Sequence, residues 1–250
     1  MTPIDNFEAL HERGSPLILF NIWDAGSALA VARAGAKAIA TGSASLAGAQ
    51  GFEDGEGIPF EALLVTVRQI KAACPDLPLT VDFETGFASD LAALEANARA
   101  LIDAGAVGCN FEDRWLDREG LRAIDDQADR IGTLARAGLF VNARTDLFLA
   151  AMPAGEDPNR ADLVEGALER AAAYQAAGAR SFFVPGLSDP DLIARMCEGA
   201  GLPLNVMRLS GMVDNAELAK LGVARISYGP GPWNEAMSAV ERAAEAALMT

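Results

Sequence analysis

The sequence has few of the residues that histidine-based metal, redox and covalent-catalysis sites require. It contains one histidine, His11, and three cysteines, Cys74, Cys109 and Cys197. The cysteines are scattered and fit no metal-ligand spacing. No histidine metal site or Ser-His-Asp triad can be assembled from this set. We expect His11 to face solvent in an opening helix and Cys109 to be packed within a strand.

Positive charge is also scarce. The three lysines, Lys37, Lys71 and Lys220, all fall in expected helices or turns, which disfavours a Schiff-base aldolase. The net charge is −15 and the isoelectric point is about 4.4. Such a chain repels polyanions, so we expect neither nucleic acid nor an anionic membrane as a partner. A small anionic substrate would need local positive charge.

Long apolar runs are missing as well. No uncharged apolar stretch approaches the roughly 18 residues of a membrane span. The segment 1–16 is charged and lacks the apolar centre of a signal peptide. Together with the few, odd-numbered cysteines, this predicts a cytoplasmic protein without disulfides.

What the chain does contain is one phrase, an apolar strand followed by an alanine-rich helix, repeated eight times after an opening helix from Asp5 to about Arg13. We expect strands over 17–23, 38–41, 79–84, 107–112, 139–144, 181–184, 204–207 and 225–228. We expect helices over 27–34, 60–73, 90–103, 125–137, 161–177, 190–197, 215–221 and 233–248. Eight such units in 250 residues predict a single (β/α)₈ barrel domain, residues 1–250. A doubly wound open sheet is the alternative, but no Gly-x-Gly-x-x-Gly follows the first strand.

The expected strand ends carry acidic residues. Asp82 and Glu84 alternate with apolar residues, so in a strand both would point the same way. Like charges about 4 Å apart repel by roughly 4 kcal/mol at an effective dielectric constant near 20. Solvent, a raised pKa or a bound cation must relieve that repulsion.

Further polar residues collect at the same expected end of the barrel. With Asp54 and Glu112, the acids Asp82 and Glu84 form an all-oxygen set that suits Mg²⁺, or Mn²⁺, and not zinc. Arg144 can fork onto a substrate carboxylate. The turn Thr41-Gly42-Ser43 can offer backbone N–H groups to an oxyanion.

Plainer interpretations of these residues exist. A lone Asp-x-Glu is usually a solvated strand end, and Asp54 taken alone belongs to a flexible acidic loop. Arg144 could be the structural partner of Glu112, because ion-pair networks also occur without catalysis. The convergence of all of them at one barrel end favours a functional site.

Six stretches, in order over nearly the whole chain, resemble the isocitrate lyase/phosphoenolpyruvate mutase superfamily, in particular its short bacterial members. They are residues 21–27, 51–56, 81–86, 105–113, 142–146 and 183–187. The resemblance implies a phosphoenolpyruvate mutase-like barrel that binds Mg²⁺ and a small anionic 2-oxo acid. It also implies a homo-oligomer, either a dimer with swapped C-terminal helices or a tetramer made of two such dimers.

By this resemblance, Asp82 is the direct metal ligand, and Glu84, Glu112 and Asp54 bind the metal mostly through water. The candidate substrate-binding residues are Thr41, Gly42, Ser43, Asp82, Arg144 and Asn205. The candidate catalytic residues are Asp54, Arg144 and Glu112.

The loop after the fourth strand departs from the superfamily. Lyases carry a Lys-Lys/Arg-Cys-Gly-His loop whose cysteine is the acid/base, and mutases and phosphonopyruvate hydrolases carry a lysine and an asparagine. Residues 114–122 contain no cysteine, histidine, lysine or asparagine. Asp113 or Arg114 could assist protonation, although arginine can only orient or stabilise. After strand six, Pro185 stands where mutases have histidine.

We therefore expect a lyase that cleaves a C–C bond through a metal-stabilised enolate. A phosphonomutase or an oxo-acid hydrolase or decarboxylase of the same superfamily is the first alternative. A non-catalytic 2-oxo-acid-binding protein is the second, and a purely structural barrel is the third.

Overall fold

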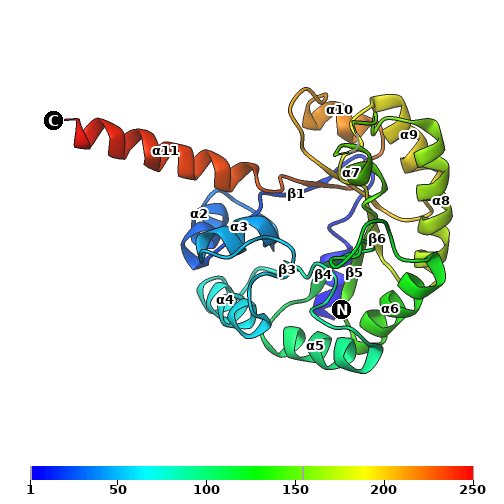
Figure 1. Ribbon diagram of the computed structural model, residues 1–250, viewed down its shortest axis with the longest axis horizontal. Coiled ribbons are helices and arrows are strands. Elements are labelled where there is room, and N and C mark those ends of the chain that lie inside the picture. Colours follow the sequence, from blue (N-terminus) through cyan, green and yellow to red (C-terminus); the bar gives the residue numbers. More distant parts are fainter. Residues whose placement is uncertain (1, 154, 250) are drawn as a thin grey trace.

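Eight parallel strands form the centre of the protein. A computed structural model describes residues 2–153 and 155–249. Its strands are β1 Leu17–Leu19, β2 Ile39–Ala40, β3 Leu79–Asp82, β4 Gly108–Glu112, β5 Phe140–Arg144, β6 Ser181–Phe183, β7 Leu204–Met207 and β8 Arg225–Ser227. They pair in the order β1-β8-β7-β6-β5-β4-β3-β2. A parallel bridge between Ile22 and Thr41 joins β1 to β2, so the sheet curls into a nearly closed barrel (Figure 1).

Helices alternate with the strands and surround much of the barrel (Figure 1). They are α1 Pro3–Glu8, α2 Ala25–Arg33, α3 Ser43–Ala49, α4 Phe60–Ala73, α5 Leu91–Asp103, α6 Ile124–Ala137, α7 Leu147–Ala151, α8 Ala161–Ala176, α9 Pro190–Gly199, α10 Asn215–Lys220 and α11 Gly231–Leu248. The predicted (β/α)₈ barrel is confirmed.

Local sequence explains where these helices begin. Aspartates at 24, 90, 189 and 214 accept hydrogen bonds from backbone N–H groups of the first turns of α2, α5, α9 and α10. The opening helix α1 is capped by Thr2 and not by Asp5, which instead completes a capping box as the third helical residue. The short helices α3 and α7 were not predicted, because each directly follows a strand end that was interpreted as loop.

The bottom of the barrel, at the N-terminal ends of the strands, is closed by α1. Phe7 is fully buried with Leu17, Leu19 and Phe140 inside the barrel. The prediction that His11 faces solvent is wrong, since it is 7% exposed and its ring stacks on Phe140 with 4.7 Å between centroids. The short helix ends at Glu8, and His11 lies in the segment that follows it. Cys109 is buried in β4, as predicted.

The last helix, α11, leaves the barrel and extends away from it (Figure 1). In this single chain Pro232 is its one buried residue among those described. The outer face of β1 and its neighbourhood is correspondingly uncovered, with Ile18 and Phe20 exposed to 38% and 41%. Within the described residues, no helix has the length and apolar character to cross a membrane.

Candidate active site

A pocket of about 210 Å³ opens at the C-terminal ends of the strands, the end of a (β/α)₈ barrel where active sites lie. Residues from all eight strands, or from the segments that follow them, meet there. The polar lining consists of Asn21, Ser43, Ser45, Asp54, Asp82, Asn110, Arg144 and Ser227. The remaining lining includes Gly42, Ala44, Leu149, Phe183, Pro185, Met207, Gly229 and Pro230. A volume this small fits a ligand of a few heavy atoms.

Asp82 is the last residue of β3 and faces this pocket. Its Oδ2 accepts a hydrogen bond from the Ser43 N–H at 3.1 Å, and its own N–H donates to Thr41 Oγ1 at 2.9 Å. Its Oδ1 is buried and has no partner among the described residues. Burial raises the pKa of Asp82, and the Arg144 guanidinium opposes that rise. Asp82 therefore presents one free carboxylate oxygen.

Glu84 lies in a turn and not in the strand. β3 ends at Asp82, and Glu84 has a φ of +48°, so strand alternation does not set its direction as predicted. Its Oε2 accepts from the Glu56 N–H at 2.8 Å. Burial first, then Asp82, Glu112 and Asp54, raise the pKa of Glu84 to about 8. The carboxylate is thus close enough to the other three acids to sense their charge.

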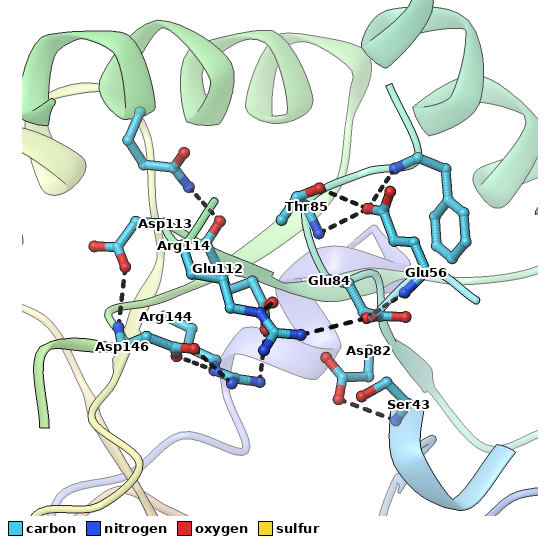
Figure 2. A network of polar contacts seen from close by, with 12 residues as sticks. Ser43, Glu56, Asp82, Glu84, Thr85, Glu112, Asp113, Arg114, Arg144 and Asp146 are labelled. Carbon is cyan, nitrogen blue, oxygen red and sulfur yellow. Dashed lines mark hydrogen bonds and ion pairs between the residues drawn. The ribbon is translucent and has the colours of Figure 1, made fainter. Parts of the chain in front are cut away.

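Glu112, at the end of β4, is held between two guanidinium groups (Figure 2). Its Oε2 forms an ion pair with Arg144 Nη1 at 2.8 Å, and its Oε1 accepts a hydrogen bond from Arg114 Nε. Arg114 Nη2 also lies 3.9 Å from Glu84 Oε2. Burial raises the pKa of Glu112 to about 7, against the effect of Arg144.

Arg144 already has carboxylate partners. It contacts Asp146 through Nε (2.5 Å) and Nη2 (2.9 Å) in addition to Glu112. Burial alone would lower the pKa of Arg144, but Glu112, Asp146 and Asp82 together raise it well above its ordinary value. Arg144 lines the pocket while Glu112 does not. Both the structural and the substrate-binding interpretation of Arg144 therefore have support.

Asp113 does not face the pocket, so the expectation that it assists protonation is not supported. Its side chain points away from Glu84 and Asp82 (Figure 2) and accepts hydrogen bonds from the Asp146 N–H at 2.9 Å and from Arg170 and Tyr174. Asp113 instead anchors the turn that follows Arg144.

The amide groups predicted to hold an oxyanion are largely engaged within the barrel. Thr41 N–H donates to the Thr80 carbonyl and Gly42 N–H to the Ile22 carbonyl, both at 3.1 Å, while Ser43 N–H donates to Asp82. The next two amides, of Ala44 and Ser45 in the first turn of α3, have no partner in the described part of the chain and line the pocket. Free amides at a helix start can accept an anionic oxygen.

Of the remaining predicted site residues, some line the pocket and others do not. Asp54 lies in the exposed segment after α3 and lines the pocket. Asn205 and Thr41 do not line it, and Asn205 is fully buried and exchanges hydrogen bonds of 3.2 Å with Ser227. Gly42, Ser43, Asp54, Asp82 and Arg144 are thus brought together at one pocket, with Glu84 and Glu112 behind it.

Two residues that position this site were missed. Glu56 Oε1 accepts from the Thr85 and Phe87 N–H groups at 3.0 and 2.9 Å, and so joins the Asp54 segment to the β3 turn. Asn21 accepts from the N–H groups of Tyr228 and Gly229 and donates to the Thr41 carbonyl at 2.8 Å. The sequence did offer a sign of Asn21, because it is a polar residue near the end of the apolar run expected as the first strand, 17–23.

The oxygen donors of the pocket fit Mg²⁺ better as one direct ligand than as a full set of direct ligands. Among the described residues, no three His, Cys, Asp or Glu side chains are close enough to ligate one ion directly. Mg²⁺ commonly takes one or two carboxylates and keeps several waters. The unpartnered Asp82 Oδ1, with Asp54, Glu84 and Glu112 around it, fits one direct ligand and contacts through water.

Comparison with known structures places the fold among the phosphoenolpyruvate mutase and isocitrate lyase barrels. A Burkholderia cenocepacia protein, provisionally described as a phosphonomutase, is 43% identical with a TM-score of 0.92, over 97% of this chain and 99% of that one. A phosphonopyruvate hydrolase solved with oxalate and Mg²⁺ is 21% identical, with a TM-score of 0.84 over 97% of this chain and 85% of that one, and so shares the fold.

The chain belongs to the phosphoenolpyruvate phosphomutase family, whose profile matches residues 7–248. An uncharacterised Mycobacterium tuberculosis protein is 31% identical over 96% of this chain and 88% of its own. The 2-methylisocitrate lyase of Salmonella typhimurium is 30% identical over 81% of this chain and 69% of its own. The relatives that carry an assigned activity are lyases and mutases, which supports an enzyme.

Proposed function

We propose that this protein is a Mg²⁺-dependent lyase, with Mn²⁺ as a possible substitute, that binds a small 2-oxo acid and cleaves the adjacent C–C bond. The observation that carries the proposal is the free, buried Asp82 Oδ1 at the floor of a small pocket, opposite Arg144 and the unengaged amides of Ala44 and Ser45. The magnesium and oxalate of the phosphonopyruvate hydrolase structure support the choice of ion and ligand class.

The chain's own residues account for binding an oxo acid. Arg144 lines the pocket, and its acidic neighbours keep its guanidinium protonated. It can therefore neutralise a substrate carboxylate. The amides of Ala44 and Ser45 donate to the oxygen on which negative charge develops when the bond breaks. Mg²⁺, when bound, would supply Lewis-acid stabilisation of that same charge.

Proton transfer falls to Asp54 or to a water that it orients. Asp54 is the exposed acid of the pocket lining, and no histidine or cysteine lines the pocket among the described residues. Glu112 acts on the reaction through Arg144, which it holds at 2.8 Å. We therefore propose catalytic roles for Asp54 and Arg144, and a positioning role for Glu112.

A phosphonomutase, or an oxo-acid hydrolase or decarboxylase, is the second candidate. It is favoured by the 43% identical structure and by the absence of a lyase Cys and His from 114–122. A non-catalytic oxo-acid-binding protein is the third candidate, favoured by the same loop.

Turnover separates these functions. The purified protein with Mg²⁺ is incubated with 2-methylisocitrate-type and malate-type hydroxy acids, oxaloacetate and phosphonopyruvate, and products are followed by ¹H and ³¹P NMR. A lyase cleaves a C–C bond of the hydroxy acid and releases pyruvate or another 2-oxo acid, which is the ligand class proposed for the pocket. Conversion of phosphonopyruvate alone supports the mutase or hydrolase, and oxalate binding without any turnover supports the binding protein.

We further propose that the protein is a homo-oligomer in which α11 of one copy covers the exposed outer face beside β1 of another. An isolated 18-residue helix with one buried residue gains little stability in water. Strands of a parallel barrel are normally covered on their outer face, yet Ile18 and Phe20 are not.

A further inference from the structure

The interior of the barrel holds a cation. Arg225, at the start of β8, is fully buried, although bulky apolar side chains usually fill this space. Its Nη2 donates to Asn110 Oδ1 at 2.8 Å. In the described part of the chain, Nε and Nη1 of Arg225 have no hydrogen-bond partner, and no carboxylate forms an ion pair with it. Burying a charged guanidinium without an ion-pair partner costs desolvation energy, so the presence of Arg225 here needs a physical reason.

Arg225 determines which way the neighbouring amides point. A guanidinium can only donate, so the Asn110 atom that faces it must be the oxygen. Asn142 Nδ2 donates to the same oxygen at 2.8 Å, and Ser181 Oγ donates to Asn142 Oδ1 at 2.6 Å. The series of hydrogen bonds from Arg225 to Ser181 has only one consistent assignment of donors and acceptors, and Arg225 imposes it.

This arrangement leaves the Asn110 Nδ2 group free. Asn110 is only 4% exposed and lines the pocket, and its Nδ2 has no partner among the residues that the structure describes. Asn110 is also paired in register with Asp82 on the adjacent strand. A ligand held at Asp82 therefore lies beside two N–H donors of a buried amide.

We propose that Asn110 is a ligand-binding residue that donates from Nδ2 to an anionic or carbonyl oxygen of the bound oxo acid, and that Arg225 is the positioning residue that fixes this orientation. The inference rests on the proposed function, since it takes the ligand to be a 2-oxo acid. It adds to that function a specific contact: the Asn110 amide offers N–H donors beside the Asp82 carboxylate, where a carboxylate or oxo oxygen of the ligand can accept them.

Arg225 fits a positioning role better than a stabilising one. Burial lowers its pKa to about 9, which leaves it charged at neutral pH. Because no carboxylate among the described residues forms an ion pair with Arg225, replacing it with an apolar side chain of similar size breaks no buried ion pair. We therefore expect Arg225→Met to fold and to retain its thermal stability while losing control of the Asn110 amide.

Isothermal titration with oxalate, at saturating Mg²⁺, tests the proposal. Asn110→Asp keeps the shape but replaces the donor with an acceptor, and we expect oxalate to bind ten- to a hundredfold more weakly, the range of a hydrogen bond to a charged group. Arg225→Met should weaken oxalate binding severalfold, and Arg225→Lys, which also can only donate, should restore part of it. Thr80→Val is the matched control, because Thr80 is a buried β3 side chain whose hydroxyl has no partner among the described residues.

The outcomes are distinct. Unchanged oxalate affinity in folded Asn110→Asp overturns the binding role of Asn110, with the proposed function intact. Weak binding in Asn110→Asp with unchanged binding in both Arg225 variants overturns the positioning role. If the wild-type protein binds no oxalate with Mg²⁺, the proposed function and this inference both fail.

Discussion

At the scale of single residues, the charge balance of the pocket depends on two arginines with different exposure. Arg144 is buried among Glu112, Asp146 and Asp82, whereas Arg114 is about one-third exposed and reaches Glu112 and Glu84 from the segment after β4 (Figure 2). Arg114 thus contributes positive charge close to the oxygens that would surround a divalent cation.

Arg114→Met is expected to increase the affinity for Mg²⁺. Removing one positive charge near the site reduces the repulsion of a divalent ion, and we expect about three- to tenfold tighter binding at low ionic strength. Titration with Mn²⁺, followed by electron paramagnetic resonance, measures this. Arg118→Met is the control, because Arg118 lies 3.5 Å from the Trp115 ring centre and forms no ion pair with a described acid. Equal affinity in wild type and Arg114→Met would contradict the account.

The pocket residues that sequence could predict are those at strand ends. Asp82 and Arg144 follow from alternation and from the position of their strands, and both line the pocket. Glu56 could not be predicted, because its role depends on a φ of +58° that turns its carboxylate back onto the Thr85 and Phe87 amides. Glu84 was placed at the right acid cluster for an incorrect reason, since a turn and not a strand directs it.

At the scale of elements, the opening helix acts as a plug for the barrel and makes His11 a buried residue. His11 Nδ1 lies 3.0 Å from the Phe7 carbonyl oxygen, so Nδ1 carries the proton. Burial, with a smaller effect of Arg225, lowers the pKa of His11 to about 3. This role could not be predicted because α1 has few apolar residues, and only Phe7 of the helix is buried. The position of His11 is set by the segment after Glu8.

His11 should make the barrel sensitive to acid. Below its ordinary pKa of about 6.5 the unfolded chain takes up a proton that the folded chain does not, so stability present above pH 6.5 is lost as the pH falls toward 3. Between pH 7.5 and pH 5 this contributes a loss of about 2 kcal/mol. Urea unfolding of wild type and His11→Gln across this range measures it. The stability gap between them should narrow at low pH, and parallel curves would contradict the prediction.

At the scale of the whole molecule, α11 is the feature that a single chain does not explain. Its exposed apolar residues Met237, Val240 and Leu248 fall on one side of the helix, at spacings of three and eight residues. Trp233 anchors the start of the helix, 5.1 Å from Trp23 between ring centroids. The rest of α11 projects beyond the barrel (Figure 1). This shape is what the proposed helix exchange between copies requires.

Val240→Glu is expected to weaken the proposed oligomer. A charge buried in an apolar interface without a partner is costly, so the mass from light scattering after size exclusion should fall toward 26.1 kDa on dilution. Glu235→Gln, on the opposite side of α11, should leave the mass unchanged. A wild-type protein that is itself monomeric would refute the proposal.

The fold could be predicted because eight similar strand–helix units leave little choice of architecture. The lengths of the strands could not be predicted. β1 ends at Leu19 and β3 at Asp82, since the chain turns to build the pocket where alternation alone would extend the strand. The central claim of the account, however, concerns the pocket: Asp82 binds Mg²⁺, and the ion and the pocket together bind an oxo acid.

The most direct measurement is the thermal shift caused by oxalate with Mg²⁺ or with EDTA. Saturation about a hundredfold above the dissociation constant stabilises by about 2.7 kcal/mol, which for this length is a rise of about 5–10 °C in Tm. The account predicts that rise with Mg²⁺, none with EDTA, none in Asp82→Asn, and the full rise in Glu53→Ala, whose exposed side chain does not line the pocket. An equal rise in Asp82→Asn, or a rise that does not need Mg²⁺, would contradict it.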